Sequence, residues 1–243
     1  MIIIPMAGKS SRFFNEGYDI PKYMLPLNGN SNVFKESVKS FQNYFKTDFF
    51  LFITRSDFEV KDFVEKECNF LGIKNFEIVS LDNDTRGQAD TVKIGLQKTK
   101  YNKDEEIYIF NIDSIRVNFT KPTSTFLTDS EGYLEVFEGE GDHWSFIEAD
   151  KNNLVKRTTE KIRISNLCSN GLYYFSSVSL FNQTFNNIEL DNIYNELFIA
   201  PMYNHIIKLN NIVKYRLLDK TQTLFSGTPS EYKLLLKNQS ILK

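Results

Sequence analysis

A short segment near the N-terminus combines hydroxyl groups with basic side chains. Residues 5–12, PMAGKSSR, directly follow an apolar run at residues 1–4, and a further cation, Lys22, comes ten residues later. The polar side chains of the segment are Lys9, Ser10, Ser11 and Arg12. Gly8 leaves the main chain open to a ligand, and backbone N–H groups, hydroxyls and cations together can surround an anion. The segment therefore indicates a triphosphate site, with an ordinary surface turn as the alternative.

Two better-known phosphate-binding patterns do not describe this segment. It is neither a complete Walker A loop nor a G-x-G-x-x-G dinucleotide fingerprint. A single glycine is a weaker signal than either pattern. The choice between a triphosphate site and a surface turn therefore depends on the surrounding elements and on the later motifs.

The spacing of apolar residues predicts the elements that position this segment. Strands are expected at residues 1–4, 49–54, 76–81 and 107–113, and helices at about 32–45, 60–72 and 87–99. Strands that alternate with helices of this length form a mostly parallel sheet through right-handed crossovers. Functional side chains are then expected just past the carboxyl ends of the strands, and Asp113 is the last residue of the fourth strand.

The second half of the chain has a different pattern. Strands are expected in close succession at residues 133–138, 144–149, 154–158 and 171–175, followed by a helix at about 191–209 and a strand at 212–218. We interpret them as an antiparallel extension of the same sheet. The chain is then one domain, 1–243, with a nucleotide-binding part at about 1–115 and an acceptor-binding part at about 116–243.

Composition excludes several classes of partner. The 243 residues include 29 basic and 31 acidic side chains, which give a net charge of −2. This nearly balanced charge does not favour binding to nucleic acid. No apolar run approaches the ~18 residues of a membrane span, and the N-terminal run is too short for a signal peptide. Cys68 and Cys168 lack metal-ligand spacing and indicate reduced thiols. We therefore expect a cytoplasmic protein that binds small molecules, and a homo-oligomer is compatible with the sequence.

Seven short motifs occur in a fixed order along the chain. They are PMAGKSSRF, PKYMLPLNG, TRGQADTV, FNID, TEK, SNGLYYF and GTPSEY. In this order they resemble the sugar-phosphate nucleotidyltransferase family, which has a GT-A-like fold, and in particular its capsule-biosynthesis branch. The resemblance extends from residue 1 to about 232. It implies an α/β fold of the Rossmann-like, three-layer α/β/α type with a mixed, mostly parallel central sheet.

The resemblance also implies roles for individual residues. The expected nucleotide-binding residues are Met6, Ala7, Gly8, Ser10, Ser11, Arg12, Gly87 and Gln88. The expected catalytic residues are Arg12, Lys22, Asp113 and Lys161, and the expected acceptor-binding residues are Glu160, Lys161 and Gly171. Trp144 is a candidate wall of the acceptor pocket by its residue type, with core packing as the alternative. Physical chemistry agrees with these roles, because attack of one phosphate on another brings two anions together and therefore requires cations and alignment.

Asp113 is the expected ligand of the cofactor, Mg²⁺. This hard ion takes one or two carboxylates together with phosphate oxygens and water. Many family members carry a second acidic ligand two residues before the glycine of a late D-x-G-T motif, where this chain has Phe225. Glu196 is the candidate substitute, with a solvent-exposed helical glutamate as the alternative. A second departure is Ser10, which stands where the family loop has its second glycine.

The predicted function is a Mg²⁺-dependent nucleotidyltransferase that joins a nucleoside triphosphate to a phosphorylated metabolite and releases pyrophosphate. The resemblance favours CTP over UTP and dTTP, and a role in capsule or surface polysaccharide biosynthesis. A sugar phosphate, a polyol phosphate, phosphocholine and a phospho-amino acid such as phosphoglutamine are the candidate acceptors. Two alternatives remain: a GT-A glycosyltransferase that uses a finished nucleotide sugar, and a nucleotide-binding regulatory protein without catalysis.

Overall fold

Two compact units make up the chain. The structure, a computed structural model, describes residues 1–27, 29–191 and 196–237. Unit 1 comprises Met1–Ile3, Asp84–Phe110 and Lys121–Lys220. Unit 2 comprises Ile4–Asn83, Asn111–Thr120 and Thr221–Lys243.

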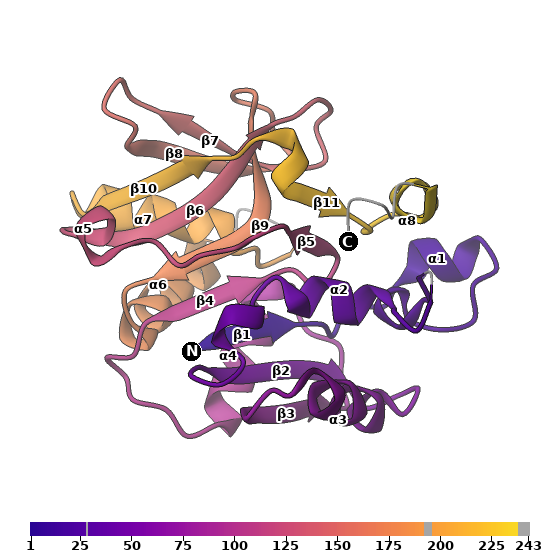
Figure 1. Cartoon of the computed structure of the whole chain (residues 1–243). Helices are drawn as coiled ribbons and strands as arrows, with labels where there is room; N and C mark the ends of the chain where they lie inside the picture. Colours follow the sequence, from indigo (N-terminus) through magenta and orange to yellow (C-terminus); the bar gives the residue numbers. More distant parts are fainter. Residues whose placement is uncertain (28, 192–195, 238–243) are drawn as a thin grey trace. The chain divides into compact units, whose positions relative to one another are not determined.

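A mixed sheet forms the centre of unit 1 (Figure 1). Its strands lie in the order β10 (Ile212–Leu217), β6 (Ser130–Glu138), β9 (Leu167–Phe175), β4 (Ile107–Phe110) and β1 (Ile2–Pro5), the first two residues of β1 belonging to this unit. β1 is parallel to β4 and β10 is parallel to β6, whereas β9 is antiparallel to both of its neighbours. The hairpin of β7 (Ser145–Ala149) and β8 (Val155–Glu160) joins β9 through Phe146 and Cys168.

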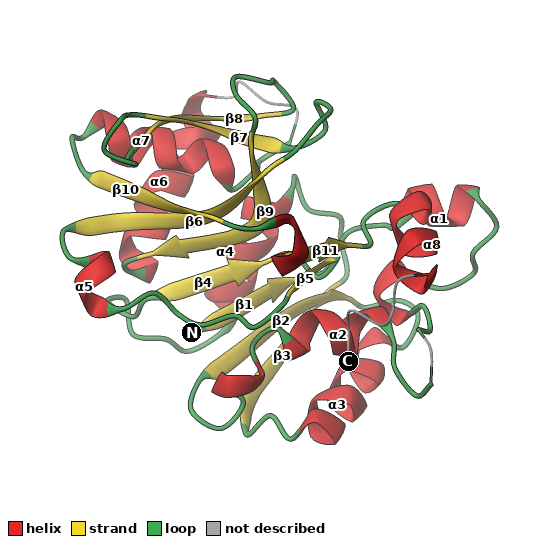
Figure 2. Cartoon of the chain, turned by 45° about the horizontal axis from the view of Figure 1, so that its top comes forward, coloured by secondary structure: helices red, strands yellow, loops and turns green. Residues whose placement is uncertain are grey.

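Helices cover this sheet and close its core. They are α4 (Gln88–Lys98), α5 (Ser124–Leu127), α6 (Val178–Asp191), the 3₁₀ turn η3 (Ala200–Met202) and α7 (Tyr203–Lys208). α6 and α7 pack on each other, α6 also on β9 and α7 on β10 (Figure 2). Tyr203 is fully buried: its ring stacks on Phe175 at 4.9 Å, and its hydroxyl donates to the backbone oxygens of Tyr133 and Tyr174 at 3.0 and 2.9 Å. The buried hydroxyl is therefore satisfied within the core.

Unit 2 contains a βαβ element and a small antiparallel pair. β2 (Phe49–Arg55) and β3 (Asn75–Leu81) are parallel and are joined by α3 (Val60–Leu71). β5 (Ser114–Arg116) pairs with β11 (Thr223–Phe225) in the antiparallel sense. The remaining helical elements are α1 (Ser11–Asn15), η1 (Lys22–Met24), α2 (Val33–Lys39), η2 (Gln42–Tyr44) and α8 (Pro229–Lys237), and η4 (Lys220–Gln222) begins at the end of unit 1.

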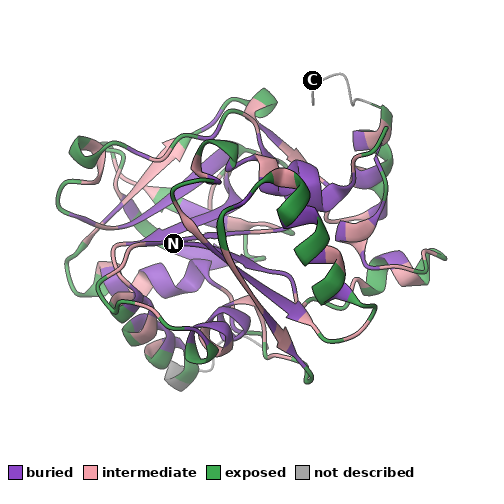
Figure 3. Cartoon of the chain, turned by 60° about the horizontal axis from the view of Figure 1, so that its bottom comes forward, coloured by how far each residue is buried: buried purple, intermediate pink, exposed green. Residues whose placement is uncertain are grey.

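The apolar pattern that predicts α3 also explains its packing. Val60, Val64 and Cys68 are fully buried on one face of the helix, and Gly72 ends it with φ +75°, in the left-handed region that glycine adopts without strain. β1, β2, β4 and β9 are buried along most of their length, and Figure 3 colours buried residues purple. Among the helices of residues 1–27, 29–191 and 196–237, none is both long and apolar enough to cross a membrane.

The predicted fold class, an α/β protein with a mixed central sheet and flanking helices, is confirmed. The helix expected at 191–209 is wrong: residues 196–199 are not helical, and α7 begins only at Tyr203, after Pro201, a residue suited to a first turn. Residues 192–195 lie outside the described residues. β10 is parallel to β6, not antiparallel, because α6 and α7 return the chain to the end at which β6 begins.

Candidate active site

The basic loop of unit 2 begins at a buried anchor. Met6 is 2% exposed, and its N–H donates to the carbonyl oxygen of Ile53 in β2 at 2.8 Å. The other predicted loop residues are half-buried or exposed: Ala7, Gly8, Ser10, Ser11 and Arg12. A Cβ built on Gly8 would have no atom within 4 Å, so the main chain there is open to a ligand. The loop is shorter than expected, because Ser11 and Arg12 already form the first turn of α1.

Ser10, Lys22 and Asp113 are brought together although they are far apart in sequence. The Ser10 hydroxyl accepts the backbone N–H of Lys22 at 3.2 Å, which fixes the start of η1. The Lys22 Nζ atom lies 2.5 Å from Asp113 Oδ2. Both side chains are only partly exposed, 21% for Lys22 and 23% for Asp113. Two of the predicted catalytic residues are therefore in direct contact in unit 2.

The pairing of β5 with β11 positions Asp113. Asp113 lies three residues beyond β4, not within the strand as expected, and it directly precedes β5. Ser114 pairs with Phe225, and the backbone N–H and the hydroxyl of Ser226 donate to the carbonyl oxygen of Asp113 at 2.8 and 3.1 Å. A Cβ built on Gly227 would lie 2.9 Å from Asp113 Oδ2. Gly227 therefore leaves the space that the carboxylate occupies.

These residues fit a hard divalent cation. The Asp113 carboxylate already accepts a cationic group, the Lys22 ammonium, and Gly227 beside it has no side chain that would displace the carboxylate. In the described part of the chain no group of three or more His, Cys, Asp or Glu side chains has metal-binding geometry. Mg²⁺ does not require such a group, since it is commonly bound by one or two carboxylates together with substrate phosphates and water.

In unit 1, Gly87 is the N-cap residue directly before α4, and its backbone closely approaches that of Leu197. The Ala89 N–H donates to the Leu197 carbonyl oxygen at 2.9 Å, and the Leu197 N–H donates to that of Arg86 at 2.7 Å. Gly87 has φ +136°, and a Cβ on it would lie 2.6 Å from both the backbone N and O of Leu197. Gln88, the expected base-recognition residue, is the first residue of α4.

Substitution of Gly87 by alanine is expected to lower the free energy of unfolding by about 2–4 kcal/mol, because it adds a backbone clash and a strained φ. Chemical denaturation measures this loss. Gly17→Ala is the matched control: Gly17 has φ +87° but no atom within 4 Å of its Cβ position, so only the conformational strain applies. Equal losses for the two variants would contradict the close approach at Leu197.

The β7–β8 hairpin brings several predicted acceptor residues together. Ser145 and Glu160 are paired across the two strands, and the Ser145 hydroxyl donates to the Glu160 carboxylate. The same hydroxyl lies 3.2 Å from the hydroxyl of Tyr173 in β9. The Lys161 N–H donates to the Trp144 carbonyl oxygen at 2.9 Å. Trp144, Glu160 and Lys161 therefore belong to one cluster at the end of the hairpin.

The Lys161 side chain connects this cluster with the segment that contacts Gly87. Its Nζ atom lies 3.9 Å from Glu196 Oε2 and 4.6 Å from the centroid of the Phe198 ring. Leu197, between these two residues, is the partner of the Gly87 turn. Glu196 is exposed and lies outside any helix, contrary to the expectation. Its proposed role as a metal ligand stays a prediction.

Trp144 and Gly171 have clear structural contacts. The Trp144 Nε1 donates to the Glu140 carbonyl oxygen at 3.0 Å, and its ring contacts Phe137 edge-on at 5.1 Å. Gly171 is buried in β9 with φ +92°, where the pairing of β9 with β6 is irregular. The irregular strand explains the need for glycine at this position. Contact of either residue with the acceptor stays a prediction.

Burial raises the pKa of the Glu160 carboxyl above its usual value, against the opposing effects of the Ser145 hydrogen bond and the Lys161 charge. The Glu160 carboxyl therefore binds a proton more readily in the folded protein than in the unfolded chain. At neutral pH its ionised form lowers the free energy of unfolding, and this loss of stability disappears as the pH falls through the folded pKa toward that of the unfolded chain.

Glu160→Gln is therefore expected to raise the thermal midpoint at neutral pH, with the gain vanishing at a pH below the ordinary carboxyl pKa, as measured by thermal melts across pH. Glu148→Gln, at a half-exposed position of the same hairpin, is the control and should change little. A lower midpoint for Glu160→Gln at neutral pH would show that the ionised carboxylate is net stabilising.

Several residues near these clusters were given no role from the sequence. They are Ser145, Phe198, Ser226, Gly227 and Glu231. Gly227 and Glu231 lie in the motif GTPSEY, and TPSE at residues 228–231 also has the spacing of a helix-capping box. The others depend on strand pairing or on contacts between distant segments.

Comparison with known proteins identifies the family. The chain is 41% identical to the nucleoside-diphosphate-sugar pyrophosphorylase from Vibrio cholerae RC9, over 98% of this chain and 100% of that one, with a TM-score of 0.92. The fold is also that of the inositol-1-phosphate CTP transferase from T. maritima (14% identity, 100% and 95% coverage, TM-score 0.74) and of UDP-glucose pyrophosphorylase complexed with UDP-glucose (15%, 100% and 98%, TM-score 0.72). No protein-family profile and no curated protein matches the chain.

The match to the Vibrio protein covers 98% of this chain and therefore extends over both units. An α/β fold alone would leave the chemistry open, since one fold hosts many activities. A sequence identity of 41% over 98% of this chain and 100% of the Vibrio protein is sufficient to assign the class of reaction. The chain belongs to the nucleoside-diphosphate-sugar pyrophosphorylase family, whose members are nucleotidyltransferases.

Proposed function

We propose that the chain is a Mg²⁺-dependent nucleotidyltransferase that joins CTP to a small phosphorylated metabolite and releases pyrophosphate. The acceptor is a sugar phosphate, a polyol phosphate, phosphocholine or a phospho-amino acid such as phosphoglutamine. The product is an activated precursor for a capsule or another surface polysaccharide, made in the cytoplasm. The chain acts as one catalytic domain, with the nucleotide bound mainly by residues 1–115 and the acceptor mainly by residues 116–243.

One observation carries the proposed reaction: the 41% identity to a nucleoside-diphosphate-sugar pyrophosphorylase over 98% of the chain. The Lys22–Asp113 contact beside the open Gly8 loop supports it, because a cation and a metal-binding carboxylate are what phosphoryl chemistry requires. The preference for CTP rests on the resemblance of the motifs to the capsule-biosynthesis branch.

The proposed chemistry is a direct displacement. An oxygen of the acceptor phosphate forms a bond to the α-phosphorus of the nucleotide, and the bond from that phosphorus to the bridging oxygen of the β-phosphate breaks. The electron pair leaves with pyrophosphate. Mg²⁺ bound at Asp113 would neutralise and align the phosphates.

The side chains supply charge and orientation. Arg12 and Lys22 stabilise the negative charge that collects on pyrophosphate. Lys161 orients the acceptor phosphate, exchanging its present contact with Glu196 for the substrate. Gln88 contacts the base edge with its amide, which has both a donor and an acceptor.

Pyrophosphate release is the direct test. The protein is incubated with Mg²⁺ and each of CTP, UTP, ATP, GTP and dTTP, against a panel of sugar, polyol, choline and amino-acid phosphates. Release with CTP and one acceptor supports the proposal and identifies the acceptor. Release only with another nucleotide overturns the base assignment, and transfer from a finished nucleotide sugar without any pyrophosphate release overturns the reaction.

A further inference from the structure

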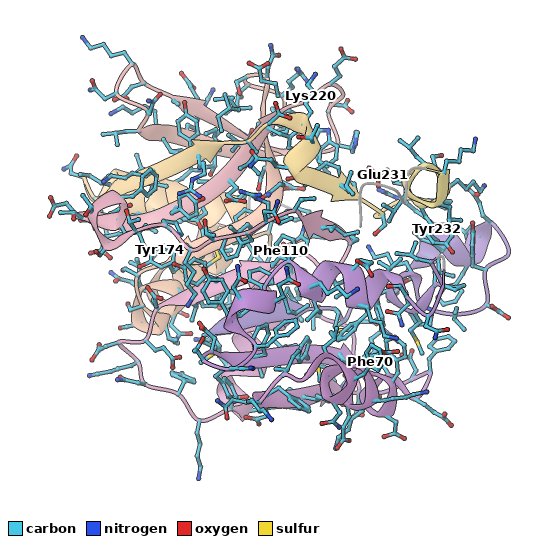
Figure 4. The ribbon with its side chains drawn as sticks, in the orientation of Figure 1. Phe70, Phe110, Tyr174, Lys220, Glu231 and Tyr232 are labelled. Carbon is cyan, nitrogen blue, oxygen red and sulfur yellow. The ribbon has the colours of Figure 1, made fainter. Side chains whose placement is uncertain are left out.

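Phe225 leaves the predicted metal site of this chain one carboxylate short of the family pattern. The inference below rests on the proposed function, because it concerns the same Mg²⁺ site at Asp113. The segment that follows Phe225 brings another carboxylate to this place. Glu231 belongs to unit 2, in the first turn of α8 (Figure 4).

The geometry at Gly227 sets an upper limit on the distance between the Asp113 and Glu231 carboxylates. The position that a Cβ would take on Gly227 lies 2.9 Å from Asp113 Oδ2 and 3.4 Å from Glu231 Oε2. The two oxygens can be separated by no more than the sum of these distances, 6.3 Å. Mg²⁺ binds oxygen at about 2.0–2.1 Å and keeps several waters, so an ion on Asp113 is within reach of Glu231 through one of those waters.

A capping box fixes the Glu231 side chain. Its Oε2 accepts the Thr228 N–H at 2.8 Å, and its own N–H donates to the Thr228 hydroxyl at 3.2 Å. A carboxylate held in this way has little freedom to turn away from Asp113. Only one lone pair of one oxygen is used by the Thr228 N–H, and a carboxylate has four.

The helix that carries Glu231 is itself anchored. The hydroxyl of the next residue, Tyr232, donates to the Pro26 carbonyl oxygen at 2.6 Å, and its ring contacts those of Phe13 and Tyr18 edge-on at 6.2 and 5.9 Å. Tyr232 is 5% exposed. Figure 4 labels both residues on α8. The start of α8 is therefore packed against α1 and the turn at Pro26.

The local charge also favours a divalent cation. Asp113 and Glu231 contribute two negative charges, and the Lys22 ammonium, 2.5 Å from Asp113, contributes one positive charge. In the proposed reaction Lys22 contacts the phosphates, which would leave both carboxylates without that neighbour. A doubly charged ion compensates both carboxylates together.

We propose that Glu231 is the second carboxylate of the Mg²⁺ site and takes the part that an acidic residue at the position of Phe225 plays in other family members. The α8 capping box thus has two roles: it begins the helix and it holds a metal-facing oxygen beside Asp113. Glu196, which belongs to unit 1, is then not needed for the metal.

The test compares Mn²⁺ binding, followed by the electron paramagnetic resonance signal of the free ion, without and with CTP. Glu231→Gln keeps an oxygen that accepts the Thr228 N–H, so it keeps the capping box and removes only the charge. It is expected to raise the dissociation constant for Mn²⁺ by about 10-fold or more, with a thermal midpoint close to that of the unmodified protein.

Two further variants separate the possible outcomes. Thr228→Ala breaks the capping box but keeps both carboxylates, so it should lower the thermal midpoint with Mn²⁺ binding preserved. Asp113→Asn should abolish Mn²⁺ binding. If Glu231→Gln binds Mn²⁺ like the unmodified protein while Asp113→Asn does not, Glu231 is only a capping residue and the proposed function stands. If neither substitution changes Mn²⁺ binding, the metal site of the proposed function is wrong as well.

Discussion

Asparagine in place of Asp113 is expected to lower kcat/KM for pyrophosphate release on the order of 10³-fold or more, the scale on which loss of one charge-stabilising group acts in phosphoryl transfer. The amide keeps the shape of the side chain and the space beside Gly227, but it has no negative charge for Mg²⁺. Steady-state pyrophosphate release over a range of Mg²⁺ concentrations measures the effect, and excess Mg²⁺ should not restore the rate.

The same substitution should change stability little. The Lys22–Asp113 pair is about one-fifth exposed on each side, so solvent screens its attraction, and partly exposed pairs contribute up to about 1 kcal/mol. Asp62→Asn is the control, since Asp62 is an exposed carboxylate on α3 of the same unit. A folded Asp113→Asn protein that keeps more than a tenth of the activity would remove Asp113 from the catalytic centre.

Local periodicity was sufficient to predict the β2–α3–β3 element. Val60, Val64 and Cys68 recur at helical spacing and Gly72 ends the helix, so the sequence alone contains the necessary information. By contrast, no helix was expected at residues 178–191, where the structure has α6. Phe181, Phe185 and Ile188 of α6 also lie at helical spacing and are buried, but three asparagines lower its helix propensity. Its tertiary contacts with α7 and β9, which are invisible in a local window, compensate for that propensity.

In the candidate site, too, some features could be predicted from the sequence and others could not. The loop at residues 5–12, Lys22 and Asp113 could each be identified from motifs, but their contact could not. Lys22 and Asp113 are 91 positions apart, and the pairing of β5 with β11 that fixes Asp113 joins two three-residue strands more than 100 positions apart. Strands this short have no readable period. Glu231 had a readable capping signal, but its place beside Asp113 depends on the same pairing.

Methionine in place of Lys22 is expected to lower kcat/KM on the order of 10²–10³-fold, because an unbranched apolar side chain replaces the ammonium that stabilises the leaving pyrophosphate. The effect on metal binding should have the opposite sign. The Lys22 Nζ lies 2.5 Å from Asp113 Oδ2 and competes with a metal ion for that oxygen, so Mn²⁺ alone should bind the variant more tightly. Pyrophosphate assays and Mn²⁺ titrations measure the two changes on one protein sample.

This opposite change distinguishes a catalytic lysine from a structural one. Lys39→Met removes a comparable ion pair in the same unit, 2.8 Å between Lys39 Nζ and Glu36 Oε1, and should alter neither activity nor Mn²⁺ affinity. If Lys22 served only to hold η1 against Asp113, its loss would lower the thermal midpoint and would weaken Mn²⁺ binding through a displaced carboxylate. Tighter Mn²⁺ binding together with slower turnover requires instead that the ammonium and the metal alternate at the same oxygen, which couples metal binding at Asp113 to the arrival of the nucleotide phosphates.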